Sequence, residues 1–547
     1  MISITPEKLK KLQNGSDIRG VALAGVAGEE PNLTAAEARV LTFGFLLWLQ
    51  KKTGKKAEDL TVSIGHDPRL SGDDLAAAAA GALCERGVRV LDCGLASTPA
   101  MFMSTVFEAD TSDGAIMITA SHLPWNRNGF KYFTAGGGLE KADIRAIIDM
   151  GYEAFEDGLI SPLAPEHSGP ACTVTGEAGP ACAACSVPCG ASFKATRPEP
   201  ADLMARYAEH LRALISKALT DQGAGGAPLA GLHIVVDAGN GAGGFYATKV
   251  LEPLGADISG SLFLEPDGHF PNHAPNPENK EAMHAISEAV LKSHADLGII
   301  FDTDVDRSAA VDETGREIAR NGIVAMAAAL IAEDHPGSTV VTDSITSKQL
   351  GEFLTGRLGL KHLRFKRGYR NVINKSIELN AAGTDSWLAI ETSGHAALKE
   401  NYFLDDGAYL ATKIVIKTAL LHREGKAVSS VIEDLAEPLE AREVRFPIAG
   451  EDFAATGDRI LEDLRAFVNA EIAAGHTAIT LEEPNYEGVR INFDAGHGDG
   501  WCLLRKSLHD PIMPLNLESD SKGGTDIMAS ILRDFLKKYD ALDISAL

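Results

Sequence analysis

The chain reads Thr119-Ala120-Ser121-His122-Leu123-Pro124 directly after a short apolar run, Ala115 to Ile118. Such a run is typical of a buried strand. The residues that follow include a Pro, two Asn and a Gly, so they are expected to form a loop. Ser121 and His122 would then lie where a strand ends. A polar turn is the plain alternative for a Ser-His pair, but three later stretches favour a functional loop.

The composition limits the classes of partner. The chain has 547 residues, too many for one core, and 45% of them are hydrophobic, which is ordinary for a globular protein. A net charge of -25 argues against binding nucleic acid or an anionic membrane surface. An anionic small molecule stays possible if basic residues gather in one cleft.

The sequence shows no membrane or export signal. No uncharged apolar run reaches the length of a membrane span, and the first residues lack a signal-peptide core. The seven cysteines include three in segments typical of core. We therefore expect a cytoplasmic protein with reduced thiols.

Strand-like runs alternate with helix-like runs along the chain. An alanine-rich helix is expected over Asp73 to Arg86. This alternation predicts α/β layers with largely parallel sheets, in which ligands bind at the carboxyl ends of strands. The expected strands are Leu60 to Ile64, Val88 to Asp92, Ala115 to Ile118, Leu232 to Asp237, Leu297 to Phe301, Ser338 to Thr342 and Trp387 to Ile390.

One segment, Ser161 to Pro200, interrupts this alternation. It is rich in Ala, Gly, Pro and Cys and has no period, so it is interpreted as an inserted loop or linker. Asp202 to Leu219 then predicts an amphipathic helix that opens the next domain. The insertion holds clustered cysteines that could bind Zn²⁺, although a surface loop with reduced thiols explains them equally well. They are Cys172, Cys182, Cys185 and Cys189.

A second motif is acidic. Asp302, Asp304 and Asp306 alternate directly after the strand Leu297 to Phe301, and Arg307 follows them. Three carboxylates on one loop can converge on a hard cation, and oxygen ligands suit Mg²⁺. A solvated acidic turn is the alternative. The motif is not an EF-hand, because the glycine and the distal glutamate are missing.

Two more motifs follow apolar runs. Glu391-Thr392-Ser393-Gly394-His395 offers hydrogen-bonding groups for vicinal hydroxyls, although a capped helix start would also explain it. Arg505-Lys506-Ser507 offers a guanidinium and a hydroxyl that suit a phosphate. Alone, an Arg-Lys pair is usually a solvated surface.

Together these motifs resemble those of the α-D-phosphohexomutases, the phosphoglucomutase and phosphomannomutase superfamily. Nearly the whole chain outside the insertion takes part in the resemblance. Further matching stretches are Ser16 to Gly20, Gly65 to Ser71, Asp237 to Gly243 and Pro266 to His273.

The resemblance implies three α/β domains with mixed sheets plus a smaller α+β C-terminal domain around a central cleft. We expect a phosphoserine-loop domain over residues 1–200 and a metal-loop domain over 201–320. A sugar-binding-loop domain over 321–440 and a phosphate-binding domain over 441–547 would follow.

It also implies a reversible phosphoryl transfer between the 1- and 6-positions of mannose or glucose phosphate. Hexose 1,6-bisphosphate would be activator and intermediate, and Ser121 would carry the phosphoryl group. The implied Mg²⁺ ligands are Ser121, Asp302, Asp304 and Asp306. The implied catalytic residues are Ser121, His122, Lys131, Arg19 and His395. The implied substrate-binding residues are Arg307, Arg367, Glu391, Ser393, His395, Arg505, Ser507 and His509.

Some positions depart from the family pattern. Leu123 replaces an Asn, Ser16 replaces a Tyr, and Leu508 replaces an amide donor of the phosphate loop. Arg367 and Arg370 look like variants of a Val-Gly-x-Lys stretch, and the extra guanidinium would offset the altered loop.

Two alternatives stay open: a phosphoglucosamine mutase, and a catalytically silent sugar-phosphate-binding paralogue. The intact Ser121, the three aspartates and Lys131 count against the silent paralogue. The expected partners are small sugar phosphates, with no nucleic acid and no membrane, and the expected assembly is a monomer or homodimer.

Overall fold

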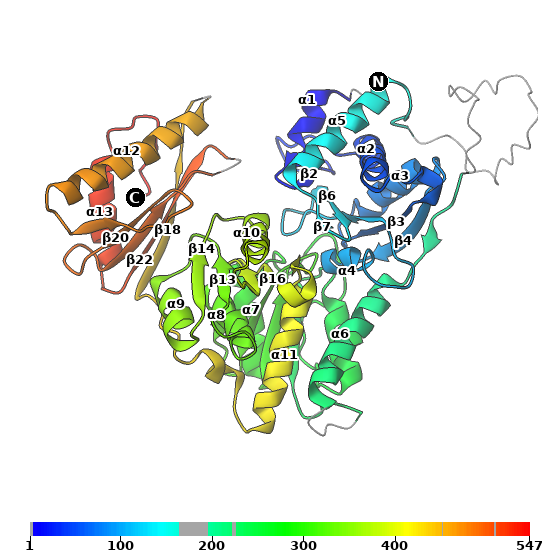
Figure 1. Ribbon diagram of the computed structural model, residues 1–547. Coiled ribbons are helices and arrows are strands. Elements are labelled where there is room, and N and C mark those ends of the chain that lie inside the picture. Colours follow the sequence, from blue (N-terminus) through cyan, green and yellow to red (C-terminus); the bar gives the residue numbers. More distant parts are fainter. Residues whose placement is uncertain (1–3, 164–194, 221–225, 451, 508–509) are drawn as a thin grey trace, which may run out of the picture. The chain divides into compact units, whose positions relative to one another are not determined.

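The computed structural model describes residues 4–163, 195–220, 226–450, 452–507 and 510–547 (Figure 1). By its internal contacts the chain forms two compact units. Unit 1 contains residues 1–317 and 404–428, and unit 2 contains residues 318–403 and 429–547. Across the described ranges, no helix is both long and apolar enough to cross a membrane.

The first sheet of unit 1 is mixed. Its strands are β1 (Gln13–Asn14), β2 (Asp17–Val21), β3 (Thr61–His66), β4 (Arg89–Leu95), β5 (Gly114–Ile118), β6 (Arg127–Thr134), β7 (Gly137–Gly138) and β8 (Glu199–Pro200). Their order is β1-β2-β6-β5-β3-β4-β8, with β7 paired to β6. β3 is parallel to β4 and β5, whereas β6 is antiparallel to β5 and β2.

Strand β8 corrects one prediction. Glu199 and Pro200 were expected to end an irregular linker, but they pair in parallel with Leu91 and Asp92 of β4. The linker prediction is therefore wrong for these two residues. The strand is too short to show a period, so its sequence carries no strand signal. Residues 164–194, with all four clustered cysteines, lie outside the described residues, and the Zn²⁺ hypothesis stays a prediction.

Helices cover both faces of the first sheet (Figure 1). Those on one face share a core with the sheet, and α4 lies on the other face. The helices are α1 (Pro6–Lys11), α2 (Ala35–Thr53), α3 (Gly72–Cys84), α4 (Thr98–Met103) and α5 (Lys141–Glu156). Helices α2 and α5 approach closely at two glycines, since a Cβ on Gly44 would lie 2.1 Å from Ile147 O and one on Gly151 2.5 Å from Val40 O.

The second sheet of unit 1 has the order β12-β11-β10-β9. Its strands are β9 (Ile234–Asp237), β10 (Leu297–Phe301), β11 (Ser308–Asp312) and β12 (Glu317–Ile318). β9 and β10 are parallel, whereas β10 and β11 are antiparallel. Helices α6 (Leu203–Thr220), α7 (Lys280–Ser293) and α11 (Gly407–Arg423) belong to this part of unit 1.

Helix α11 begins against the acidic loop, the segment 302–307 that follows β10. Gly407 N–H donates to Val305 O at 3.1 Å, and a Cβ on Gly407 would lie 2.5 Å from the carbonyl carbon of Arg307. Only glycine fits so close to that backbone. This contact explains why residues 404–428 belong to unit 1 although they follow the third sheet in the sequence.

Unit 2 contains a mixed sheet and an antiparallel sheet. The mixed sheet includes β13 (Thr339–Thr342), β14 (Lys361–Arg364), β15 (Leu388–Ile390) and β16 (Ala396–Leu398), followed in the chain by β17 (Leu404–Asp405). β13 is parallel to β14 and β15, and β15 is antiparallel to β16. Its helices are α8 (Asn321–Ala332), α9 (Lys348–Glu352) and α10 (Tyr369–Ala381).

The antiparallel sheet has the order β18-β22-β21-β20-β19. Its strands are β18 (Glu440–Pro447), β19 (Ile479–Leu481), β20 (Val489–Phe493), β21 (Gly500–Leu504) and β22 (Ile512–Ser519). Helices α12 (Phe453–Ala473) and α13 (Gly524–Leu536) share one apolar core with it. Short 3₁₀ and π turns complete the chain: Ala57–Asp59, Tyr246–Leu251, Glu252–Leu254, Phe353–Arg357, Lys399–Asn401 and Val428–Ile432.

The fold class is as predicted: three α/β domains with mixed sheets and a C-terminal domain with an antiparallel sheet. The expected strands correspond to β3, β4, β5, β9, β10, β13 and β15, with ends that differ by up to three residues. The predicted domain boundaries stay predictions.

One carboxyl group of the antiparallel sheet predicts a pH dependence of stability. Burial raises the pKa of Glu518 to about 7 from 4.5, although a hydrogen bond from Trp501 and the charges of Arg490 and Arg364 oppose this. The folded state therefore retains a proton that the unfolded chain releases. The free energy of unfolding should fall as pH rises from 4.5 to 7, by on the order of 3 kcal/mol from this group.

Glu518→Gln keeps the shape and removes the titration. It should raise the melting temperature of the C-terminal domain relative to wild type at pH 8 and leave it nearly unchanged at pH 4.5. Glu462→Gln, at an exposed position of α12, is the matched control and should shift neither value. Equal shifts at both pH values for Glu518→Gln would contradict the assignment.

Candidate active site

Arg69 holds the serine loop, residues 119–124, through hydrogen bonds to its backbone. Ser121 follows β5 with φ +50°, a left-handed conformation that a non-glycine residue adopts only when its surroundings hold it there. Thr119 Oγ1 accepts the Ser121 N–H at 2.9 Å. The Arg69 guanidinium donates to Pro124 O and Leu123 O, both at 2.7 Å, and to Ser121 O. These bonds give the buried serine one position.

The Ser121 hydroxyl contacts the acidic loop after β10. Its Oγ donates to Asp302 Oδ2 at 2.9 Å and accepts from Arg307 Nη2 at 3.2 Å. His122 Nδ1 lies 3.5 Å from the same Oγ, at the outer limit of a hydrogen bond. Part of the residue is exposed, but burial of the imidazole and the charges of Arg307 and Arg19 lower its pKa to about 3. The structure therefore places Ser121 against the loop that the sequence assigned to a metal.

The three predicted carboxylates converge. Asp302, Asp304 and Asp306 are buried, and each offers an oxygen within 4.8 Å of the others. Among the described residues, Asp304 Oδ1 is buried without a hydrogen-bond partner. A buried carboxylate oxygen without a hydrogen-bond partner lowers the stability of the fold unless a cation binds it. The cluster therefore fits a small divalent cation with oxygen ligands.

Two buried cations face the cluster. Lys131 Nζ, on β6, pairs with Asp304 Oδ2 at 3.1 Å and with Asp306 Oδ2, and Arg307 Nη2 pairs with Asp302 Oδ2 at 3.0 Å. Three carboxylates and two cations leave a formal charge of about -1. A divalent cation and a dianionic phosphate could enter together without leaving a large net charge in the interior.

The charges affect the carboxylates differently. Burial and the neighbouring Asp306 raise the pKa of Asp302 well above its usual value, and Arg307 opposes this. Burial would also raise the pKa of Asp306, but Lys131 and Arg307 outweigh it and lower that pKa. Arg19, on β2, is half-buried and pairs with Asp17 Oδ2 at 2.9 Å.

In unit 2 the predicted sugar loop follows β15. Gly394 turns the chain with φ +94°, and Glu391 N–H donates to His395 O at 2.9 Å. Ser393 Oγ lies 2.9 Å from His395 Nδ1, and the Tyr369 ring stacks on His395 with centroids 5.3 Å apart. Glu391 Oε1 accepts the Gly368 N–H at 2.6 Å. The loop is thus preorganised within unit 2.

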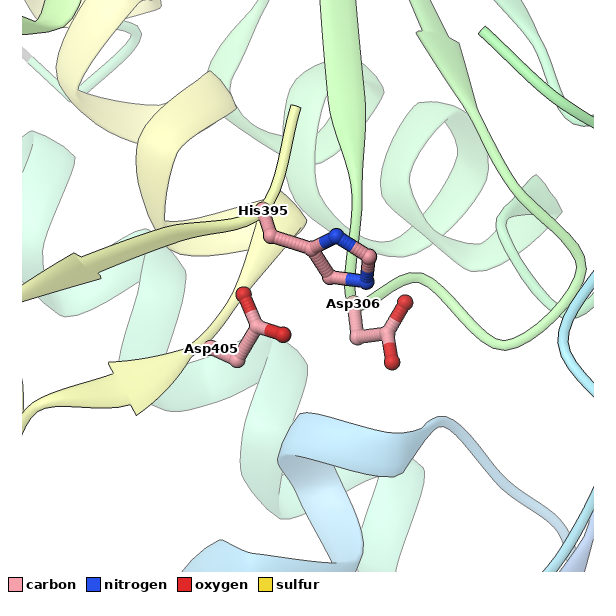
Figure 2. A group of neighbouring side chains, drawn as sticks. All are labelled: Asp306, His395 and Asp405. Atoms are coloured by element: carbon pink, nitrogen blue, oxygen red, sulfur yellow. The ribbon is translucent and has the colours of Figure 1, made fainter. Parts of the chain in front are cut away.

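Figure 2 shows His395 with Asp306 and Asp405. His395 lies where the chain enters β16 in unit 2, and Asp405 ends β17, where the chain has returned to unit 1. Asp306 comes from the acidic loop of unit 1.

Two predicted phosphate ligands of unit 2 interact through their charges. Burial and the positive charge of Arg367 lower the pKa of Arg505, and a nearby anion would oppose this effect. Arg505 Nε is buried and has no hydrogen-bond partner among the described residues. Ser507 N–H donates to Ile512 O at 3.0 Å, at the start of β22. His509, together with Leu508, lies outside the described residues.

Three side chains that form hydrogen bonds with these site residues were missed by the sequence analysis. Thr98 Oγ1, at the start of α4, donates to Asp304 Oδ2 at 2.5 Å. Asn276 Oδ1 accepts from Arg307 Nη1 at 3.1 Å. Glu487 Oε2 accepts the Arg367 N–H at 3.1 Å and a bond from Ser344 Oγ. Asn276 lies three residues after the matching stretch Pro266 to His273, and this position is its only indication in the sequence.

The fold and the site define a multidomain α/β protein whose loop serine faces an acidic cluster. Family models described as phosphoglucomutase/phosphomannomutase α/β/α domains I, II and III match residues 10–155, 205–315 and 320–439, which is more than half of the chain. The chain therefore belongs to the phosphoglucomutase/phosphomannomutase family, within the α-D-phosphohexomutase superfamily.

Relatives match most of the chain, and a solved structure shares its fold. A phosphomannomutase/phosphoglucomutase of Pseudomonas aeruginosa is 27% identical over 533 residues, which cover 96% of each chain. A phosphoglucosamine mutase of Corynebacterium jeikeium is 28% identical and covers 87% of this chain and 92% of its own. A crystal structure of a family protein from Burkholderia thailandensis has a TM-score of 0.71 at 24% identity, covering 98% of this chain and 99% of its own.

Proposed function

We infer that the protein is a hexose phosphate mutase, which moves a phosphoryl group between the 1- and 6-positions of glucose or mannose phosphate. The buried Ser121 hydroxyl between Asp302 and Arg307 is the observation that carries this inference. A hydroxyl held beside three carboxylates and two cations suits the transfer of an anionic group far better than a surface turn would. Hexose 1,6-bisphosphate is the intermediate of this proposal.

Each group near Ser121 has a role in the proposal. Asp302 accepts a hydrogen bond from the Ser121 hydroxyl, and Arg307 offers its Nη2 donor to the oxygen that carries the phosphoryl group. Lys131, which contacts Asp304 and Asp306, is the first candidate for general acid or base, and Arg19, on the same sheet, is the second. His122, whose Nδ1 lies 3.5 Å from Ser121 Oγ, orients the hydroxyl.

Mg²⁺ is the proposed metal. Asp302, Asp304 and Asp306 would hold it together with an oxygen on Ser121, and the buried Asp304 Oδ1 is available for it. When bound, it would offset negative charge on the phosphoryl group. The chain's own contribution is to keep the three carboxylates fixed and the site closed to bulk water.

The loops of unit 2 supply the proposed substrate contacts. Glu391 and Ser393 offer acceptors and a donor for sugar hydroxyls, and His395 is the third acid-base candidate. Arg367, Arg505 and Ser507 are the proposed ligands of the phosphate that does not react, with His509 as a further candidate. The charge interaction between Arg367 and Arg505 supports this assignment.

Arg505→Ala tests this assignment. Loss of one charge-assisted hydrogen bond costs roughly 1.5–3 kcal/mol, so the apparent affinity for the sugar phosphate should fall by about 10–100-fold. More free bisphosphate should also appear per turnover, since the intermediate must be held while it reorients. Steady-state kinetics and chromatography of the sugar phosphates measure both effects.

Lys506→Ala is the matched control, because the neighbouring Lys506 pairs with Asp458 at 2.6 Å on the surface. It should leave affinity and bisphosphate release unchanged. If Arg505→Ala lowers only the melting temperature, Arg505 is structural.

The proposed activity is tested by incubation with Mg²⁺, a trace of glucose 1,6-bisphosphate and each hexose 1-phosphate in turn. Formation of glucose or mannose 6-phosphate supports the proposal. Preferential conversion of glucosamine 1-phosphate in a competition assay would favour a phosphoglucosamine mutase, the activity named for one of the relatives. Binding without conversion would indicate a silent sugar-phosphate-binding paralogue. A cytoplasmic location and a monomeric or homodimeric assembly stay predictions.

A further inference from the structure

Residues 266–278 of unit 1 support both catalytic loops of this unit. They contact Arg69, which holds the serine loop, and Arg307 of the acidic loop. At the start of the segment, a Cβ on Gly268 would lie 2.3 Å from Pro68 O, so the two backbones are in close contact. The Phe270 ring lies under the Arg69 guanidinium at 5.3 Å. Because Arg69 donates to the carbonyls of the serine loop, this end of the segment supports that loop.

The other end of the segment holds Arg307. Asn276 Oδ1 accepts from Arg307 Nη1 at 3.1 Å, and Glu278 Oε2 lies 3.7 Å from the same nitrogen. On the other side of the guanidinium, Nη2 donates to Ser121 Oγ at 3.2 Å, and Nε donates to Asp302 Oδ2 at 3.1 Å. Asn276 therefore holds the Nη1 end of the guanidinium, while Asp302 holds the Nε and Nη2 side that faces the serine.

A buried histidine ties the segment to β9. His273 Nε2 lies 3.0 Å from Asp237 Oδ2, and its Nδ1 lies 3.0 Å from Ala274 O. Carboxylate and carbonyl oxygens only accept, so both bonds form only when the ring carries two protons. Gly239 makes room for the ring, since a Cβ there would lie 3.2 Å from His273 Cε1.

The electrostatics agree with this geometry. The charged groups that face His273 are Asp237, at the end of β9, and Glu281, in the first turn of α7, and both are acidic. Burial favours the neutral ring, but the hydrogen bond to Asp237 and its charge outweigh burial and raise the pKa of His273.

We propose that Asn276 is a positioning residue for Arg307, and that the doubly protonated His273 anchors the segment that presents it. The inference rests on the proposed function for its effect on turnover, whereas the protonation of His273 does not depend on it. The stabilisation that protonated His273 gives is fully present below about pH 6.5. It is lost as pH rises through the higher pKa that His273 has in the folded state.

Asn276→Ala tests the positioning role. We expect kcat to fall by about 10–100-fold, because Arg307 would no longer be held in place against Ser121 Oγ. KM should change by less than about twofold. Asn276→Asp keeps an acceptor oxygen and should recover kcat to within about fivefold of wild type. A wild-type kcat for Asn276→Ala, or an equal loss for both variants, would overturn the inference.

His273→Gln tests the anchor. The glutamine keeps one donor for Asp237 but cannot titrate. We expect the kcat of wild type to decline at alkaline pH, and the kcat of His273→Gln to be lower but independent of pH over the same range. His269→Gln is the matched control on the same segment, because His269 is exposed and contacts only Asp267 among the described side chains. Its profile should match wild type. An unchanged decline in His273→Gln would overturn the anchor.

Histidine side-chain NMR gives a readout that does not need activity. In wild type the His273 signal, assigned by its loss in His273→Gln, should titrate above pH 6.5. Titration below that value overturns the inference even if the enzyme turns over. If wild type shows no turnover, the proposed mutase activity fails, and the NMR result still decides the state of His273.

Discussion

Ser121→Ala is expected to lower hexose phosphate turnover by on the order of 10³-fold or more, because a group that carries the phosphoryl cannot be replaced by a methyl. The loop should keep its shape, since Arg69 bonds the backbone carbonyls and Thr119 bonds the Ser121 N–H. Turnover of glucose 1-phosphate, measured with bisphosphate and Mg²⁺ present, gives the fold-change, and the melting temperature reports the fold.

Ser63→Ala is the matched control for this variant. Ser63 is buried in β3 and bonds Ser112 Oγ, so its loss removes a buried hydroxyl from the same sheet. Lower stability with near-wild-type kcat is expected for this control. If Ser121→Ala kept near-wild-type kcat, Ser121 would not be the phosphoryl carrier.

Asp304→Asn is expected to have the second largest effect. Asp304 Oδ2 already bonds Thr98 and Lys131, and its Oδ1 is the oxygen available to a cation. The amide keeps the shape but removes the charge, so Lys131 and Arg307 would balance the two remaining carboxylates and the cluster would no longer attract a divalent ion. Mg²⁺ affinity should fall at least by the about 10–100-fold typical of losing an outer-shell partner.

Calorimetry of Mg²⁺ binding and the Mg²⁺ dependence of kcat measure this loss. Asp312→Asn is the matched control, because Asp312 is buried in β11 and caps a turn by accepting from Thr314 N–H at 2.9 Å. It should change stability and leave Mg²⁺ affinity as in wild type. Unchanged Mg²⁺ affinity in Asp304→Asn would remove Asp304 from the metal site.

Much of the candidate site could be predicted from local sequence. Strand β10 is a continuous apolar run, and the acidic residues follow it directly, so the sequence alone predicts both the strand and the loop. The same holds for Ser121 after β5 and Glu391 after β15. Each prediction needs only a buried strand and its first loop residues.

The residues that hold these groups could not be predicted in the same way. Thr98 and Asn276 reach Asp304 and Arg307 from other elements, and no spacing in the sequence connects them. Helix α11 belongs with unit 1 because Gly407 packs on the Arg307 backbone, a close approach that only the folded chain reveals. Such contacts depend on tertiary packing, whereas periodicity reports only local structure.

Mass spectrometry of the protein tests most directly whether Ser121 carries the phosphoryl group. Glucose 1,6-bisphosphate and Mg²⁺ are expected to add one phosphate to the peptide that contains Ser121. Excess glucose 1-phosphate should then remove this phosphate while bisphosphate forms. Formation of glucose 6-phosphate with the only phosphate on another residue, or with none on the protein, would show that Ser121 is not the carrier.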